Sequence, residues 1–420
     1  MSKWTKTTLG KIADIITGPF GSQLHQSDYV KRGIPIVMPQ DIGNRNINYS
    51  TINYVSEEDA TRLKRYSTVT NDILYARRGD VEKHAFVRAK DAGVLCGTGC
   101  LRVRINSNEV ESAFLSFYLN REETRKWLVT HAVGTNMPNL NTDILSDVPI
   151  AYPTLKEQRK IVKVLNCLEE RIVLNEKIND NLEQQLTTLY DYWFTQFDFP
   201  NENGKPYQSS GGKMVMNNCL KKKIPNGWNV ESVYSNQLSS IIKPGVDKFD
   251  TKTYFATADI KGTSLSSGTL IDYENRENRA NMQPNVNSVW FAKMKDSIKH
   301  LYLNEEMLPI ISSSILSTGF CGLQCSDVSF EYMASYISNT YFETHKDMLA
   351  HGATQEAVNN DDLAGIHIVI PDDKTLQNYH RITQPIYSQI SKNICENQEL
   401  VKIRDWLLPM LMNGQATIAD

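Results

Sequence analysis

The side chains of this sequence that are suited to chemistry are mainly ones that bind polar groups. Arg77 and Arg78 stand together in the segment YARRGDVEKH, and the planar guanidinium of arginine matches the acceptor edge of guanine and the oxygens of phosphate. The segment FAKMKDSIKH has lysines at matching positions and ends in the same Lys-His pair. These residues could contact DNA, although a solvated surface position is an equally good interpretation of any one of them.

Three further segments could bring a backbone or polar groups to a ligand. The glycines of TGPFGSQL would let the chain approach a phosphate or a base edge, or would form an ordinary tight turn. The segments GTNMPNLN and GATQEAVN supply Thr, Asn and Gln, which can bind adenine edges or cap a turn. The complete set of candidate DNA contacts is Gly18, Pro19, Phe20, Gly21, Ser22, Gln40, Arg77, Arg78, Lys83, His84, Thr135, Asn136, Lys243, Lys261, Lys293, Lys299, His300, Thr354 and Gln355.

The motifs of common catalytic sites do not occur in the sequence. It has no GxxxxGK[ST] phosphate loop, no GxGxxG dinucleotide loop, no GxSxG nucleophile turn and no HExxH zinc motif. The segment PDDK, residues 371–374, resembles a nuclease acidic cluster, but acidic side chains are favoured in a first helical turn. We therefore interpret PDDK as a helix cap and predict no catalytic residues.

The cysteines predict no metal site. Cys96 with Cys100, and Cys321 with Cys325, could supply four thiolates to one zinc ion. Each pair lies in or beside a segment with the pattern of a buried strand, which favours a packing role. The sequence contains 7 cysteines and its start, MSKWTKTTLGK, lacks an apolar signal core. Reduced thiols and a cytoplasmic location are expected, without a membrane span.

Composition and charge exclude some classes of protein. With 40% hydrophobic and 22% charged residues among 420, the chain has the composition of a globular protein with two or three domains. Its net charge of −3 excludes a protein that coats nucleic acid through bulk positive charge. Residues 1–150 contain 8 Lys and 11 Arg against 9 Asp and 7 Glu, whereas residues 221–370 contain 11 Lys and 2 Arg against 9 Asp and 8 Glu. A role on DNA would need one-sided basic surfaces or a basic partner.

The second half of the chain repeats features of the first half in the same order, with small changes of spacing that loop insertions would produce. This order predicts a tandem duplication. The five matches are Trp4 with Trp228, Asp41 with Asp259, CGTGC from Cys96 with CGLQC from Cys321, Gly134 with Gly352, and Pro153 with Pro371.

Each repeat has the pattern of a mixed α+β domain. Short runs such as IPIVM, DILYA, CLRVR, TYFATA and NSVWFA are rich in β-branched and aromatic residues, and Gly, Asn and Asp bound them. The segments ESAFLSFYLNREETRKWLV and FEYMASYISNTYFETHKDML have apolar residues at helical spacing.

A long helix is predicted after each repeat. From Ile161 to Trp193, apolar residues recur in steps of four and three, with Asn175 and Asn179 in the middle. This heptad pattern predicts a coiled-coil helix. The second helix shows a weaker seam, Ile382, Ile386, Gln389, Asn393, Glu396, Leu400, Ile403 and Leu407. Buried asparagines fix register, so the two helices are expected to pair, and Pro385 is expected to kink or divide the second one.

These patterns predict an α+β architecture of two similar mixed domains separated by two long helices that form an antiparallel coiled coil. The predicted segments are a first domain at 1–153, a helix at 154–197, a linker at 198–223, a second domain at 224–371 and a second helix at 372–413. The apolar ends of the helices could be core or could contact another subunit. The residues predicted for such an interface are Leu189, Trp193, Phe194, Trp406, Leu407 and Leu408.

Four segments together are typical of one known family: YPTLKEQRKIV, the joining segments FDFPNENGKPYQSSGGKMV and LKKKIPNGW, and IRDWLLPMLMNGQ. With them the sequence resembles, over nearly its whole length, the specificity subunit of type I restriction-modification systems, although PDDKTLQNYH only partly keeps the Glu-Gln of KEQRK. In that family each variable domain is a target recognition domain, and the long helices are spacers that bind modification subunits.

The resemblance implies a subunit without catalytic activity that reads a bipartite site on double-stranded DNA, one half with each target recognition domain. It also implies partners: DNA methyltransferase (modification) subunits, two in number, and in some systems restriction subunits. No cofactor is expected on this chain, and S-adenosylmethionine is expected on the modification subunit. Two alternatives remain open from the residues alone, a coiled-coil scaffold without DNA selectivity and a nuclease that uses PDDK.

Overall fold

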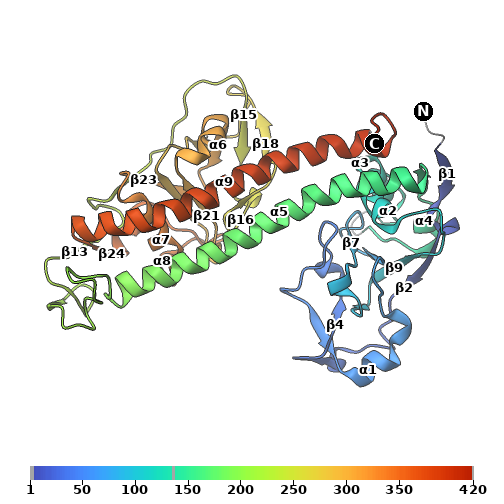
Figure 1. Ribbon diagram of the computed structural model, residues 1–420, viewed down its shortest axis with the longest axis horizontal. Helices are drawn as coiled ribbons and strands as arrows, with labels where there is room; N and C mark the ends of the chain where they lie inside the picture. The colour runs from blue at the N-terminus through green and yellow to red at the C-terminus, as the bar shows by residue number, and fades with distance from the viewer. Residues whose placement is uncertain (1–3, 135–137, 419–420) are drawn as a thin grey trace. The chain divides into compact units, whose positions relative to one another are not determined.

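The computed structural model describes residues 4–134 and 138–418. Contacts between residues divide the chain into two compact units, one formed by Met1–Glu169 with Lys402–Asp420 and the other by Glu170–Val401. We call them unit 1 and unit 2. Each contains a domain rich in strands and a segment of each of two long helices (Figure 1). Because the division cuts both helices, it does not correspond to the five predicted segments, which remain a prediction.

Two four-stranded sheets form the framework of unit 1. The first is antiparallel, with strands in the order β2 (Ala13–Thr17), β9 (Cys100–Ile105), β6 (Ile73–Ala76) and β7 (His84–Phe86). The second has the order β3 (Tyr29–Val30), β5 (Asn53–Val55), β4 (Ile34–Val37) and β8 (Leu95–Cys96), where β4 and β8 run parallel. A further antiparallel pair joins the two ends of the domain, β1 (Thr5–Thr8) and β10 (Pro149–Tyr152).

Helices pack against both sheets of this framework. Phe114 and Phe117 lie on the same side of one helix at helical spacing and are buried against the first sheet, together with Leu128 of the next helix. Ser56 and Asn141 cap two short helices by accepting hydrogen bonds from backbone N–H groups. The helices are α1 (Glu57–Arg62), α2 (Ser112–Leu119), α3 (Glu122–His131) and α4 (Thr142–Ser146).

Unit 2 repeats this plan. Its first sheet has the order β14 (Ser239–Ile241), β23 (Phe320–Cys325), β20 (Ser288–Ala292) and β21 (His300–Leu303). Its second sheet has the order β18 (Thr269–Ile271), β15 (Lys252–Phe255), β22 (Ser314–Ser317) and β19 (Ala280–Met282). The remaining elements are the pairs β13 (Asn229–Ser232) with β24 (His367–Ile370), β16 (Ile260–Lys261) with β17 (Ser264–Leu265), and β11 (Met214–Asn217) with β12 (Lys222–Pro225), and the helices α6 (Leu308–Ser313), α7 (Phe330–Ser338) and α8 (Thr340–Leu349).

Local hydrogen bonds repeat as well, which confirms the predicted internal repeat. Asp41 ends a 3₁₀ turn by accepting a hydrogen bond from the backbone N–H of Met38 at 2.8 Å. Asp259 does the same with Ala256 at 2.8 Å. The bridge between Val133 and Asn139 returns as the bridge between His351 and Ala357. Diverged side chains therefore stand on one conserved pattern of backbone pairing.

One of the five sequence matches was wrong. Cys96 ends β8 and Cys100 begins β9, whereas Cys321 and Cys325 both lie inside β23. The residue that corresponds to Cys100 is Phe320, because Ala76 pairs with Cys100 just as Ala292 pairs with Phe320. Short Cys-Gly segments misled the comparison, because Gly97 lies in the turn before β9 whereas Gly322 lies inside β23 against the ring of Trp290.

The two long helices are α5 (Leu155–Tyr190) and α9 (Asp373–Met412). A π-helical turn, Asp191–Thr195, follows α5. Asp372 caps α9, because its carboxylate accepts hydrogen bonds from the backbone N–H of Thr375 at 2.9 Å and from the indole N–H of Trp228 at 2.9 Å. The PDDK segment is thus a helix cap in the structure.

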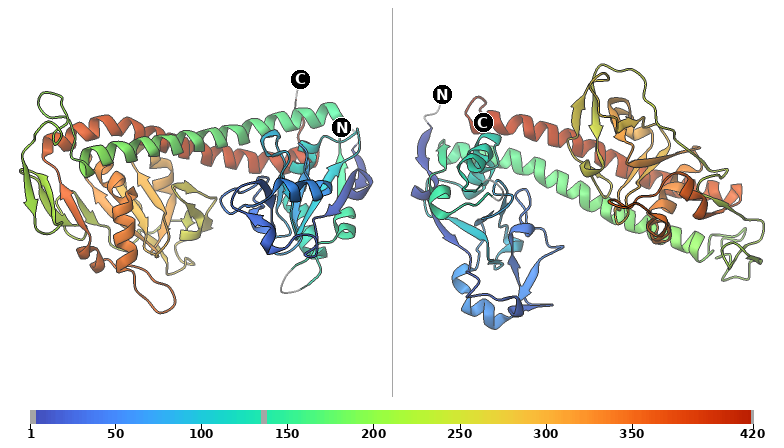
Figure 2. Two further views of the ribbon diagram at one scale, coloured as in Figure 1. Left: turned by 90° about the horizontal axis from the view of Figure 1, so that it is seen from below. Right: turned by 180° about the vertical axis from the view of Figure 1, so that it is seen from behind.

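Within unit 2, α5 and α9 lie side by side, as Figure 2 shows. The amide of Asn393 donates to the side-chain oxygen of Asn179 at 2.8 Å, and the amide of Asn175 donates to Asn397 at 2.9 Å. Since the partner number falls as the α5 number rises, the helices are antiparallel. The predicted pairing through buried asparagines is confirmed.

The predicted seam of α9 was out of register. Ile382 and Ile403 are 42% and 44% exposed, whereas Tyr379, Tyr387 and Ile390 are buried. The hydroxyls of Tyr379 and Tyr387 both hydrogen-bond to Ser335 of α7, at 2.8 and 2.9 Å. Because α9 packs against its own domain as well as against α5, its buried face is turned away from a two-helix seam.

Pro385 does not divide α9, which runs without interruption from Asp373 to Met412. A proline removes one backbone N–H and so leaves the carbonyl four residues earlier, that of Arg381, without its helical donor. Pro385 and Arg381 are both exposed. Water can therefore serve that carbonyl, and the helix can continue.

Candidate nucleic-acid interface

Loops from both sheets of unit 1 meet at one end of the domain. In the antiparallel first sheet, β2 and β6 end where β9 and β7 begin, so their connections share this end. The backbone N–H of Gly18 donates to Cys100 at 2.9 Å, that of Arg77 to Gly99 at 2.7 Å and that of Leu140 to Arg77 at 2.8 Å. We call this surface loop cluster 1, formed by residues 18–22, 38–40, 77–80, 97–99, 133–134 and 138–139.

Gly18 is needed for packing beneath this surface. A Cβ atom at Gly18 would lie 2.0 Å from the carbonyl oxygen of Gly97. Gly18 and Pro19 are buried, so neither can reach a ligand directly, and their candidacy as DNA contacts was wrong. Phe20, which is 57% exposed, stands at the surface with Gly21 and Ser22.

Two adjacent arginines of loop cluster 1 are available to a ligand. Within the described residues, Arg78 is exposed and Arg77 half-buried, and neither side chain forms an ion pair or a hydrogen bond. The buried Nε of Arg77, the hydroxyl of Thr98 and the amide oxygen of Asn139 have no partner either. Buried polar atoms are normally hydrogen-bonded. These three atoms therefore keep hydrogen-bonding capacity at the end of the domain where Gln40 is also exposed.

The Lys-His pair of unit 1 was predicted to belong to this surface, but its histidine does not. His84 is 1% exposed, and its Nε2 lies 3.0 Å from the hydroxyl of Ser116. Burial, assisted by the charge of Arg45, lowers the pKa of His84 to about 3. His84 is a neutral core residue, because a strand that is covered by α2 holds it. Lys83 remains at the surface but pairs with Asp80 at 2.6 Å.

Two candidates of the first repeat lie outside the part of the chain that the structure describes, and two further arginines of unit 1 are structural. Thr135 and Asn136 lie outside the described residues. Arg102 donates to the carbonyls of Arg65 and Ser67, and Arg104 pairs with Asp72 at 2.6 Å. These two arginines hold loops of unit 1 together and do not extend toward a ligand.

Arg45 is a structural residue that sequence reasoning missed. Its guanidinium lies 3.4 Å from the ring centroid of Phe117, and it donates to Ser116 and to Glu169 of α5, the latter at 2.5 Å. Burial lowers the pKa of Arg45 to about 10, with the charge of Glu169 acting in the opposite direction. The pair fastens the loop after β4 to the helix, and no short-range pattern would reveal it, since the two residues are far apart in the sequence.

Unit 2 forms the corresponding surface. The backbone N–H of Lys293 donates to Gly319 at 2.9 Å, and that of Val358 to Lys293 at 3.0 Å, as Arg77 does with Gly99 and Leu140 with Arg77. We call residues 242–245, 256–259, 293–296, 318–319 and 351–357 loop cluster 2. Lys243, Thr354 and Gln355 are exposed there, and Lys293 is half-buried. Lys261 is exposed on β16.

The second Lys-His pair was also wrongly assigned to the surface. His300 is 4% exposed and bonds to Glu343 at 2.7 Å, and the fully buried Lys346 donates to the same carboxylate at 2.6 Å. Burial alone would raise the pKa of Glu343, but the hydrogen bonds from His300 and Lys346 outweigh it and lower the pKa. Lys299 donates to the carbonyl of Thr257. His300 and Lys299 thus stabilise the domain itself.

The candidate subunit-interface residues divide into buried and exposed ones. Three of them are buried in the cores of their own units: Trp193, Phe194 and Leu408. They were predicted to contact a partner subunit, and their burial prevents this. Leu189 and Leu407 are partly buried against the same cores. Trp406 is 60% exposed. Exposed apolar residues that the heptad analysis passed over are Leu174, Ile178 and Tyr192 in unit 2, whereas Ile403 of unit 1 was placed in the seam and is exposed.

The remaining chemical groups are structural. Burial raises the pKa values of Cys96 and Cys321 to about 12, which disfavours the thiolate form that binds metals. In the described part of the chain, no three His, Cys, Asp or Glu side chains gather in a way that could hold a metal ion. Nor does any helix of these residues combine the length and apolarity that crossing a bilayer requires.

Comparisons with known proteins agree with this arrangement. Residues 1–184 match the family model of the type I restriction modification DNA specificity domain. The chain is 25% identical to the type I restriction enzyme MjaIX specificity subunit of Methanocaldococcus jannaschii, over 98% of this chain and 93% of that protein. It is 20% identical to the HindI specificity subunit of Haemophilus influenzae, over 99% of this chain and 100% of that protein.

A solved structure shows the same fold. The S subunit of a type I restriction-modification system from M. genitalium aligns with a TM-score of 0.52 at 14% identity, and the alignment covers 98% of this chain and 96% of that one. The fold agrees with the sequence comparisons, in which residues 1–184 match the specificity domain and the whole chain is similar to type I restriction-modification specificity subunits.

Proposed function

We propose that this chain gives a type I restriction-modification complex its DNA sequence selectivity, with each unit reading one half of a bipartite site. The observation that supports this most is the repetition of one backbone frame at loop clusters 1 and 2 with different side chains on it. A duplicated frame gives two readers of similar shape, and the differing side chains would give them different targets.

The side chains of loop cluster 1 suit both kinds of contact that such a reader needs. Phosphate contacts position a protein on the duplex, and contacts to base edges specify the sequence. The unpaired Arg77 and Arg78 could serve either purpose, and Gln40 could bind an adenine edge. In loop cluster 2 the corresponding groups are Lys293, Thr354 and Gln355.

We further propose that the modification subunits dock on the long helices. Trp406 and Tyr192 occupy corresponding places near the ends of α9 and α5, and they are 60% and 37% exposed. Large aromatic residues are favoured anchors at protein interfaces. Two such anchors fit two modification subunits, one for each helix end. The long helices would then also set the length of the unread gap between the half-sites.

Catalysis belongs to the partners in this proposal. A methyltransferase that acts on a base must take it out of the stack, so this chain would position the DNA while the modification subunit binds S-adenosylmethionine and transfers the methyl group. The division of labour also accounts for a net charge of −3 on a DNA-reading chain, because part of the phosphate neutralisation would come from the partners.

A base-resolution map of methylated bases tests the proposal. Cells that contain the modification subunit with this chain are compared with cells that lack this chain. We expect a split motif with a fixed unread gap that disappears without the chain. If no sequence is methylated while the same modification subunit is active with another specificity subunit, the proposal fails and a scaffold role gains support.

A further inference from the structure

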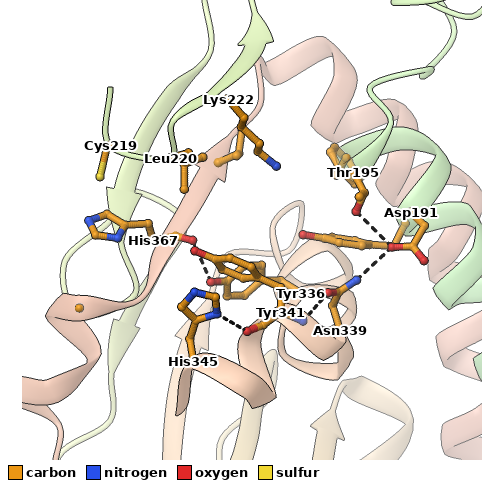
Figure 3. A pocket seen from close by; sticks show the side chains of 14 residues that line it. Asp191, Thr195, Cys219, Leu220, Lys222, Tyr336, Asn339, Tyr341, His345 and His367 are labelled. Carbon is orange, nitrogen blue, oxygen red and sulfur yellow. Dashed lines mark hydrogen bonds between the residues drawn. The ribbon is translucent and has the colours of Figure 1, made fainter. Parts of the chain in front are cut away.

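A cavity of about 500 Å³ lies in unit 2 and has no assigned role. It is bounded by the end of α5 and its π-helical turn, the hairpin of β11 and β12, the junction of α7 and α8, and β24 (Figure 3). No described residue of loop cluster 2 lines it. Its volume is within the range of roughly 300–1,000 Å³ that is common for small-ligand sites.

Nitrogen groups line part of the cavity. In Figure 3, Lys222 lies at the top of the opening, His367 at its left and His345 at its lower left. Among the described residues, the ammonium of Lys222 has no ion pair or hydrogen bond, and its one recorded contact is with the ring of Phe197 at 5.1 Å. The surrounding protein removes part of its hydration, which lowers the pKa of Lys222.

The two histidines leave ring nitrogens free in this part of the cavity. His345 Nδ1 lies 2.8 Å from the carbonyl oxygen of Tyr341, so its Nε2 is not used by that contact. The imidazole of His367 has no partner in the described structure, although its backbone carbonyl accepts a hydrogen bond from Tyr336. A ring nitrogen without a partner can form a hydrogen bond to a ligand, and the ammonium of Lys222 supplies positive charge and further donors. This part of the cavity is therefore suited to a group with several acceptor oxygens, such as a phosphate.

The opposite side offers acceptors. Figure 3 shows Asp191 there with Thr195 and Asn339. The carboxylate of Asp191 accepts hydrogen bonds from Asn339 at 3.0 Å and from Thr195 at 3.1 Å, both to the same oxygen. Its other oxygen has no hydrogen bond among the described residues. It can accept one from the amino group of a base or from a sugar hydroxyl.

Aromatic side chains also line the cavity. Tyr190, Phe194 and Tyr336 are buried, so their rings form fixed walls. Tyr341 is 37% exposed and can adjust to a ligand. Flat aromatic faces stack on nucleobases with little dependence on the base. A ligand that suits the whole cavity is anionic at one end, planar in its body, and a hydrogen-bond donor at the other end.

We propose that this cavity binds a nucleoside phosphate, with the phosphate at Lys222, His345 and His367 and the base near Asp191 and the tyrosines. A nucleotide bound in the cavity would contact the end of α5, the hairpin of β11 and β12, and the domain of unit 2. Because no described residue of loop cluster 2 lines the cavity, a failure of nucleotide binding would leave the proposed DNA recognition untouched.

Isothermal titration calorimetry on the full chain without DNA tests this inference. The probes are adenosine monophosphate, inorganic phosphate and adenosine, which separate the two ends of the ligand. We expect saturable binding of adenosine monophosphate at one site per chain, tighter than that of inorganic phosphate or adenosine alone. Equal affinity for phosphate and for adenosine monophosphate would overturn the proposal, and so would the absence of nucleotide binding to a chain that is folded by circular dichroism.

Two substitutions and a matched control locate the site. Lys222→Gln should weaken nucleotide binding by about tenfold or more through the loss of a charge-assisted contact. Tyr341→Ala should weaken it by about tenfold through lost stacking while leaving the affinity for phosphate unchanged. The control is Lys223→Gln, because neighbouring residues of a strand point to opposite sides and Lys223 does not line the cavity. If Lys223→Gln weakens binding as much as Lys222→Gln, the effect is general electrostatics and the proposal is wrong.

Discussion

The two units hold the same strand in place by different chemistry. His84 and His300 both begin the last strand of a four-stranded sheet, and both are buried. In unit 1 the neighbour of the histidine is the hydroxyl of Ser116, and α3 contributes a buried Leu128. In unit 2 the neighbour is Glu343, and Lys346 takes the place in α8 that Leu128 has in α3. A histidine beside a hydroxyl and a histidine beside a buried ion pair thus support the same backbone.

This difference teaches which features a duplicated domain must keep. The backbone pairing that shapes the loop clusters is the same in both units. The side chains differ, both in the core beneath the loops and at the loop surface. The pairing of charged side chains at the surface also differs between the two units. The exposed groups are unpaired arginines in unit 1, while in unit 2 Lys295 is paired with Glu356 at 2.5 Å. Different DNA targets would be the functional result.

The largest expected effect comes from breaking the charged core of unit 2. Lys346→Leu should lower the free energy of unfolding by about 3–5 kcal/mol, because Glu343 would lose one of its two buried partners. Replacing both Lys346 and Glu343 with leucine should recover a large part of that loss. Urea unfolding followed by tryptophan fluorescence measures both. A neutral effect of Lys346→Leu alone would show that the carboxylate does not need the ammonium.

The next effect is on the response of unit 1 to acid. The folded-state pKa of His84 is depressed to about 3, below the usual value of about 6.5. The unfolded chain therefore binds the proton first, and stability is fully present above about pH 6.5 and falls by about 1.4 kcal/mol per pH unit below it. His84→Gln should remove this slope between pH 6.5 and 5.

Glu343 of unit 2 serves as the contrast in the same titration. Its pKa is lowered, so its contribution is lost only as the pH falls below the usual carboxyl range. Urea midpoints measured from pH 7 to 5 should then respond to His84→Gln and not to changes at Glu343 that preserve the fold. An unchanged slope in the His84→Gln variant would contradict the assignment of a neutral core histidine.

A smaller effect is expected at the loop clusters themselves. Alanine at Arg77 and Arg78 should weaken specific DNA binding of the assembled complex by about 1–3 kcal/mol per base contact, and should relax only the half-site that unit 1 reads. Lys293→Ala should act on the other half-site. Binding to duplexes altered in one half, measured at two salt concentrations, separates base contacts from phosphate contacts. Equal loss on both halves for either variant would argue against separate readers.

The smallest effect on the chain alone is expected at the exposed aromatics of the helices. Trp406→Ala and Tyr192→Ala should change stability by less than about 0.5 kcal/mol, because neither residue is in a core. Both should weaken association with the modification subunit in analytical ultracentrifugation, and Trp406→Phe should retain most of it. Full association of both alanine variants would exclude these residues as anchors.

Patterns that repeat locally along the chain were readable from the sequence. The duplication, the mixed α+β domains, the two long helices and their asparagine pairing were all predicted, because periodicity and polar interruptions in a helix are properties of neighbouring residues. The helix cap at Asp372 was predicted for the same reason. Arg78, which is exposed, and Arg77, which is half-buried, stay candidates, and their role remains a proposal.

Errors arose where one residue has two packing partners or where burial depends on the whole domain. Trp193 and Phe194 looked like a surface for another subunit, but Phe194 packs edge-on against Tyr332 and Tyr379 at 4.6 and 4.9 Å. The Lys-His pairs looked like surface pairs, but a strand under α2 or α7 has no solvent to face. These outcomes depend on contacts between residues more than 100 positions apart in some cases, which no local pattern contains.

The sequence by itself therefore determined the order of elements, the repeat and the kind of side chain at each turn, since these follow from local propensity and periodicity. The tertiary structure alone decided which charged side chains form ion pairs inside the protein, as Arg45 does with Glu169 and Lys346 with Glu343, and which have no ion-pair partner. It also alone formed the cavity beside Lys222. The physical reason is that charge pairing and burial are set by distance in space, and only the packed chain fixes that distance.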